Sequence, residues 1–315
     1  MEKLLSLCAD FIKNFTQPID YTQVKNDLES ITQHNYDMYN IPFQPDIRFE
    51  EIDTFGTCGK VLNKGKTIVF NRKRLETLIS LNIDCFAENH LDNLWNFYNS
   101  YNDSTSTSKY QKCLYDYMQK YISLNVTQYF SQMGSIKNIP FELIETLLHE
   151  NQHVFQQHFW TMLKSGDIKP TKQNATMIFT MTFQSVYNQL KNNNIETNYV
   201  RQNYVFPIEF DARYTTMHIL DELYKKHFNG DKIFYRSILN SNIIPDNFDS
   251  DATVDKMFDD YLMVYEKLQA ISPETHKSEH EFICLNKQTI IQELKRRYSE
   301  MLSICDKQDN NKQHQ

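Results

Sequence analysis

Two histidines and a glutamate stand at a spacing typical of zinc sites, in the run His149-Glu150-Asn151-Gln152-His153. Residues four apart on an α-helix lie on one face, about a turn apart, so both imidazoles can reach a single Zn²⁺. The glutamate between them could act as a general base on a zinc-bound water. The alternative is that this HExxH arose by chance. Placement of both histidines on one face of a helix makes such a chance match less common.

The sequence from 143 to 163 predicts one long helix around this motif. At ~100° per residue, the two histidines share a polar stripe. The other members of that stripe are Glu142, Glu145, Thr146 and Gln156. The opposite side is apolar and contains Ile144, Leu147, Val154 and Phe155. Pro140 is typical of a first helical turn and Gly166 of the position after a last one, so we expect the helix to end there.

A catalytic zinc usually has three protein ligands and one open position, so a third ligand is expected on a downstream helix. Glu209 is the candidate, because it lies near the start of a predicted helix over 208–227. Ala212 follows on the same face and is small enough to allow close approach. Glu196 lies in a polar loop without rigid support, and Asp221 and Glu222 lie more than about three turns further along the helix, so all three are weaker candidates.

The HENQH motif followed by a PxExDA element at 207–212 resembles the gluzincin type of zincin metallopeptidases. In that family the third ligand is a glutamate on a helix after the HExxH helix. The resemblance is strong over 143–163 and 204–217, moderate over 57–81, and absent from 83–135 and 229–315. It implies a zincin-like core, in which a small sheet packs on the HExxH helix and its edge lines the substrate cleft.

One position departs from this family. Gluzincins carry an aspartate four residues after the ligand glutamate, where it accepts the N–H of a zinc-bound histidine, but this chain has Arg213 there. Glu145 or a backbone carbonyl could take that role instead. For Arg213 we expect a helix-surface salt bridge, with a substrate carboxylate or an oxyanion as the alternative partner. Tyr204 is the candidate oxyanion donor, because the resemblance implies a phenol near the third ligand.

Three further polar residues near the motifs are expected to be structural. Asp211 lies about 200° around the helix from Glu209, so we expect a cap, a salt bridge or support of a ligand rather than metal binding. His158 lies on the apolar side of its helix and should be a hydrogen-bonded core histidine. His218 lies opposite Glu209 and should also be structural.

The fold class expected from the whole chain is α+β and predominantly helical. Only 45–52 and 59–70 have the β-branched pattern of strands, and Asn63-Lys64-Gly65 predicts a hairpin turn between the last two of about three antiparallel strands. The other segments predict helices at 2–15, 21–39, 72–81, 174–191, 208–227, 234–242, 252–270 and 286–305.

These elements suggest a catalytic domain over 1–228 that carries a helical insertion at about 83–135. A helical C-terminal region at 229–306 is expected to pack on it. The Gln- and Asn-rich tail at 307–315 is expected to be disordered.

Composition narrows the classes of partner. The net charge is −7 and no long basic run occurs, so we expect no nucleic-acid partner. The six cysteines show no CxxC or paired spacing, which indicates free thiols in a reducing compartment. No apolar window reaches 18 residues and the N-terminus does not resemble a signal peptide, so we expect a cytoplasmic protein with no membrane contact.

The function expected from these features is zinc-dependent hydrolysis of a peptide bond in a peptide or protein substrate. His149, His153 and Glu209 would bind Zn²⁺, and Glu150 would be the general base. Two alternatives stay open: a zincin-fold binding or regulatory protein without turnover, and a zinc hydrolase of a non-peptide amide or ester. Nothing in the sequence predicts an oligomeric state.

Overall fold

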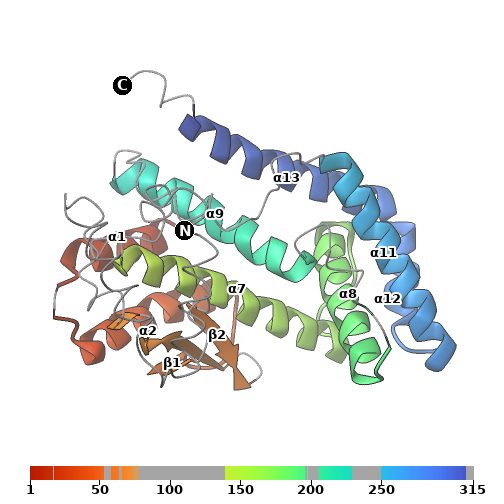
Figure 1. Ribbon diagram of the computed structural model, residues 1–315, viewed down its shortest axis with the longest axis horizontal. Helices are drawn as coiled ribbons and strands as arrows, with labels where there is room; N and C mark the ends of the chain where they lie inside the picture. Colours follow the sequence, from red (N-terminus) through yellow and green to blue (C-terminus); the bar gives the residue numbers. More distant parts are fainter. Residues whose placement is uncertain are drawn as a thin grey trace, which may run out of the picture. The chain divides into compact units, whose positions relative to one another are not determined.

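The computed structural model describes residues 1–16, 18–52, 58–63, 66–73, 75–76, 139–195, 197, 206–228 and 250–309 (Figure 1). The chain forms two compact units. Unit 1 comprises Met1–Asn151 and Ile219–Asn240, and unit 2 comprises Gln152–His218 and Ser241–Gln315. The predicted insertion at about 83–135 and the predicted helix at 234–242 lie outside the described residues, and the predicted division at 228 stays a prediction.

Unit 1 begins with two helices close to their predicted positions, α1 (Glu2–Asn14) and α2 (Tyr21–Met38). One side of α1 is buried, because its apolar residues recur at helical spacing. The α2 helix begins where the Asp20 carboxylate accepts the backbone N–H groups of Thr22 and Gln23, at 2.9 and 3.1 Å. It packs against α1 on one side and against the first strand of the sheet on another.

The sheet of unit 1 has three strands, β1 (Asp46–Glu50), β2 (Gly59–Leu62) and β3 (Thr67–Asn71), in the order β1-β3-β2. The β2–β3 pair is antiparallel, as the hairpin prediction required. The β1–β3 pair is parallel, with Ile47 opposite Ile68, so the prediction of a wholly antiparallel sheet was wrong.

The parallel pair follows from which strands are neighbours. The chain reverses direction in each of the two connections, so the first and third strands run the same way. Because β1 lies beside β3 rather than β2, that pair must be parallel. The central strand β3 is buried at all five positions, and its three middle residues are apolar.

Unit 2 is helical in its described residues. Helix α8 (Ala175–Asn192), which follows a 3₁₀ turn at Lys172–Asn174, packs against α11 (Ser250–Ile271), α12 (Lys277–Leu285) and α13 (Lys287–Asp309) (Figure 1). At the centre of this packing the ring of Phe179 stacks on Phe258, with ring centroids 5.5 Å apart.

Helices α8 and α11 lie within a few residues of their predictions, whereas the predicted helix at 286–305 differs more. A separate helix, α12, precedes it and was not predicted. Helix α13 continues to Asp309, so the residues at 307–309, which were expected in a disordered tail, are helical.

Helix α7 (Ile139–Ser165) carries the HExxH motif and is longer than the predicted segment. Pro140 is its second residue, where a missing N–H costs nothing. It ends before Gly166, whose φ of +84° is a left-handed conformation that glycine adopts without a Cβ clash. The predicted polar stripe is partly covered, because Thr146 and Gln156 are buried.

Helix α9 (Pro207–His227) contributes, like α7, to both units. No helix in the described part of the chain is long and apolar enough to cross a membrane. Cys8 and Cys284 are free thiols.

Candidate metal centre

The structure brings together the three residues predicted as metal ligands. One possible ligand atom from each of His149, His153 and Glu209 lies within 4.8 Å of the others, and all three residues are half-buried. His153 Nε2 and Glu209 Oε1 lie 3.4 Å apart. No other group of three histidine, cysteine or acidic residues in the described chain lies close enough to hold an ion.

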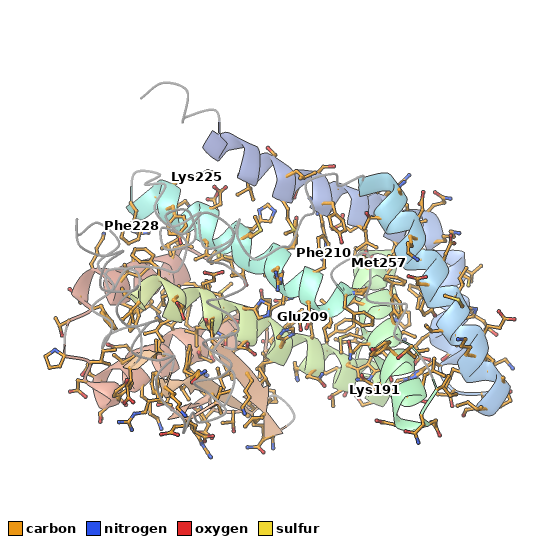
Figure 2. The ribbon with its side chains drawn as sticks, in the orientation of Figure 1. Lys191, Glu209, Phe210, Lys225, Phe228 and Met257 are labelled. Carbon is orange, nitrogen blue, oxygen red and sulfur yellow. The ribbon has the colours of Figure 1, made fainter. Side chains whose placement is uncertain are left out.

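The two histidines are neighbours because α7 is continuous through the motif, which places them one turn apart on one face. Glu209 owes its direction to the residue beside it. Phe210 is fully buried and stacks on Tyr298 of α13, with ring centroids 3.9 Å apart. Anchoring Phe210 fixes the rotation of the first turn of α9, and this sets where the adjacent Glu209, labelled in Figure 2, projects.

The donor set suits zinc. Two imidazole nitrogens and a carboxylate oxygen are a common ligand set of catalytic zinc sites. Tetrahedral coordination with bonds of ~2.1 Å separates neighbouring ligand atoms by about 3.4 Å. The distance of 3.4 Å between His153 Nε2 and Glu209 Oε1 matches this separation.

Glu150, the predicted general base, is buried with 7% of its surface exposed, and it lies beside the first residue of strand β2. A Cβ placed on Gly59 would lie 2.6 Å from Thr146 Cγ2 and 3.6 Å from Glu150 Cγ. The first of these distances is shorter than carbon–carbon contact allows. Glycine therefore permits the start of β2 to approach α7 at the turn that carries Glu150.

His153 is oriented by a glutamine on its own helix. Its Nδ1 lies 2.8 Å from Gln156 Oε1, and Gln156 Nε2 donates to the Ile208 carbonyl at 3.0 Å and to Asp211 Oδ2 at 2.8 Å. The last two partners are both acceptors, so the NH₂ group of Gln156 must face them. Gln156 therefore presents its oxygen to His153, and a ring that donates from Nδ1 leaves Nε2 on the side of Glu209.

Asp211 is buried among three side chains that donate to it. Its Oδ2 also accepts Gln152 Nε2, at 2.8 Å, and its Oδ1 pairs with Arg297 Nη1 of α13, at 2.5 Å. Burial lowers the pKa of the Arg297 guanidinium, but Asp211 and Glu293 outweigh that effect and hold the pKa above its usual value. The salt bridge was one of the roles predicted for Asp211.

Hydrogen bonds from Arg296, together with those from Arg297, lower the pKa of Glu293 to about 2. Glu293 thus stays ionised beside the two guanidinium groups. Arg297 donates to it from Nε at 2.8 Å, so the same arginine joins two carboxylates.

Four further residues were given roles from the sequence, and the structure agrees with only some of those roles. Tyr204 lies outside the described residues, and Arg213 is half-buried on α9. His218 Nε2 lies 3.2 Å from Glu300 Oε2, in keeping with a structural role. His158 differs from its prediction, because its buried Nε2 has no hydrogen-bond partner among the described residues.

Two residues around the site, Gln156 and Arg297, were given no role from the sequence. Gln156 carried a signal, because it lies on the histidine stripe one turn after His153. No sequence pattern pointed to Arg297, because it lies 144 residues after His153 on another helix.

No family model, no curated protein and no solved structure matches the chain. The interpretation of the site therefore rests on its own geometry and on the sequence motifs.

Proposed function

We propose that this protein is a zinc-dependent metallopeptidase with a zincin-type core, and that His149, His153 and Glu209 hold the metal. The observation that supports this most is the convergence of these three side chains from two helices, with ligand atoms within 4.8 Å of one another. An HExxH motif arising by chance would not require a third ligand from a separate helix beside it.

The contact between His153 and Glu209 is a second support. The orientation of Gln156 favours a proton on His153 Nδ1, so in a neutral ring Nε2 presents a lone pair. That lone pair and the Glu209 carboxylate then face each other at 3.4 Å, and two acceptors at this distance favour a cation between them.

Hydrolysis needs few groups in this scheme. Bound zinc would polarise the scissile carbonyl and lower the pKa of a coordinated water to about 7. Glu150 would take a proton from the attacking water as its oxygen bonds to the carbonyl carbon. It would pass this proton to the amine as the carbon–nitrogen bond breaks, so no covalent enzyme intermediate forms.

The position of β2 favours a peptide as the substrate. In the described sheet this strand lies at the edge, and its first residue lies against the turn of α7 that carries Glu150. An extended peptide can add to such an edge through main-chain hydrogen bonds, which an unrelated ester or small amide would not form.

The test combines metal content with turnover. Protein purified without chelator should contain about one zinc per chain by elemental analysis, and it should hydrolyse an unstructured protein such as casein. Glu150→Gln should keep the zinc and lose hydrolysis. His149→Ala, His153→Ala and Glu209→Ala should lose or weaken zinc binding, because each removes one of three ligands.

Matched controls separate these effects from damage to the helices. His158→Gln changes a histidine on α7 outside the motif, and Glu222→Gln changes a carboxylate further along α9, so both should keep zinc and activity. A wild-type protein that purifies without zinc and does not bind added zinc would refute the metal site. Full activity in Glu150→Gln would refute the proposed base, and stoichiometric zinc without peptide hydrolysis would refute the peptidase function.

A further inference from the structure

Residues remote from the HExxH motif determine how one of the proposed ligands is presented. Arg297 of α13, Asp211 of α9 and Gln156 of α7 form a continuous series of contacts that ends at His153 Nδ1. We propose that Asp211 and Arg297 are positioning residues that hold the proton of His153 on Nδ1, so that Nε2 presents its lone pair on the side of Glu209. The effect on zinc binding rests on the proposed function, whereas the position of the His153 proton is a property of the metal-free protein.

Two groups compete for the proton of the His153 ring. Gln156 Oε1 favours the proton on Nδ1, whereas the Glu209 carboxylate, 3.4 Å from Nε2, favours it on the other nitrogen. The side chain of Glu209 is 45% exposed and can turn toward water. Gln156 has no exposed surface and its NH₂ group has two acceptors, so it cannot rotate without losing both bonds. The proton is therefore expected on Nδ1.

Asp211 fixes the orientation of the Gln156 side-chain amide. The carboxylate accepts amide N–H groups from both Gln152 and Gln156 on the same oxygen, each at 2.8 Å. An ionised carboxylate is an acceptor only, so it excludes the flipped orientation in which Gln156 would turn its oxygen toward Asp211. The Ile208 carbonyl contributes in the same sense but is a neutral acceptor.

Arg297 holds the Asp211 carboxylate in place through the salt bridge between Arg297 Nη1 and Asp211 Oδ1. The Asp211 side chain is 5% exposed, and a buried carboxylate without a cation is strongly unfavourable. Arg297 is itself held, because its Nε donates to Glu293 and its guanidinium lies 4.9 Å from the centroid of the Tyr214 ring. Removing Arg297 would leave the buried carboxylate with the two glutamine donors, and Asp211 would no longer be held in its position against Gln156.

The first measurement uses metal-free protein, with no need for activity. Long-range ¹H–¹⁵N correlation spectra distinguish Nδ1–H from Nε2–H imidazoles, at a pH where the ring is neutral. In the wild type, the His153 resonances, assigned by their loss in His153→Ala, should be those of the Nδ1–H form. In Arg297→Met and in Gln156→Met the population of the Nε2–H form should rise. Arg296→Met is the matched control, because Arg296 has no contact with Asp211 among its hydrogen bonds, and it should leave the Nδ1–H form unchanged.

The second measurement is zinc affinity by competition with a chelator. Loss of a group that orients a ligating histidine typically weakens metal binding 10–100-fold, and Arg297→Met and Gln156→Met should lie in about that range. Arg296→Met should retain the affinity of the wild type.

A double variant separates positioning from damage to the fold. Asp211→Asn combined with Arg297→Met removes both buried charges, while the asparagine oxygen can still accept from the two glutamines. This variant should regain the Nδ1–H form and most of the zinc affinity that Arg297→Met loses. If Arg297→Met does not fold, the double variant and Gln156→Met still test the inference.

The outcomes distinguish the two proposals. A wild type that shows the Nδ1–H form but binds no zinc refutes the proposed function and retains the positioning role of the series. A wild type that binds zinc, with Nδ1–H form and affinity unaltered in Arg297→Met and Gln156→Met, refutes the positioning role and leaves the proposed function intact. An Nε2–H form in the metal-free wild type would also refute the positioning role.

Discussion

Gly59 provides a direct test of how strand β2 lies against the helix that carries the HExxH motif. A Cβ at this position would lie 2.6 Å from Thr146 Cγ2 and 3.2 Å from the Val69 carbonyl oxygen. Carbon atoms pack at about 3.5–4.0 Å, so Gly59→Ala creates an overlap of roughly 1 Å with the threonine methyl. Thr146 is buried on α7, and an added methyl in a packed region of this kind costs about 1–3 kcal/mol.

Part of this cost is offset in the unfolded chain, because alanine has fewer conformations than glycine there, an effect of about 0.4–1 kcal/mol. We therefore expect Gly59→Ala to lower the free energy of unfolding by about 1–2 kcal/mol. Thr146→Ser removes the methyl that the new Cβ would meet, and by itself should cost about 0.8 kcal/mol for the lost buried carbon.

The assay is a double-mutant cycle by urea unfolding, with the midpoint and the slope both recorded. In the double variant the nearest remaining contact is the Val69 oxygen at 3.2 Å, which a shift of a few tenths of an ångström relieves. The double variant should therefore be at least as stable as Gly59→Ala, with a favourable coupling of about 1–2 kcal/mol. Strict additivity of the two substitutions would refute the close approach of β2 to α7.

Three further predictions concern other parts of the chain. Glu293→Gln should lower stability at neutral pH, because a carboxylate whose pKa is lowered from 4.5 to about 2 stabilises the fold at pH values above its unfolded pKa. The difference in urea midpoint between this variant and the wild type should shrink as the pH falls from about 4.5 to about 2. Limited proteolysis should cut first within 102–108, a Ser- and Thr-rich stretch without an apolar residue to anchor it. First cleavage within 57–71 or 141–163 would contradict that prediction. Tyr204→Phe should lower the turnover number of the proposed peptidase with zinc content unchanged, because it removes only the proposed oxyanion donor; equal turnover numbers would exclude Tyr204 from that role.

Local patterns in the sequence were sufficient for the parts of the site that lie within one helix. The spacing of His149 and His153 fixes their common face wherever the helix packs, because the α-helical repeat is a property of the backbone. The same periodicity predicted α1, α2, α8 and α11 to within a few residues. Glu209 was chosen as the candidate third ligand from its position near the start of a helix and from the family resemblance, and the structure places it beside His153.

Pairing between strands needed the tertiary structure. The strand segments were recognisable from their β-branched residues, but which strand lies beside β3 depends on how the sheet packs against the helices. The choice of β1 as its neighbour made that pair parallel. Helix α12 was not predicted, because its nine residues are too few to show a clear apolar periodicity.

The surroundings of the site were decided by the tertiary structure alone. Asp211 and Arg297 are 86 residues apart, and each reads locally as an ordinary charged residue on a helix. Their pairing exists because Phe210 and Tyr298, each adjacent to one of them, stack in the core of unit 2. The spacing of the two histidines follows from the repeat of a single helix. The residues around them come partly from other helices, and a local sequence pattern does not indicate which helices pack together in the core.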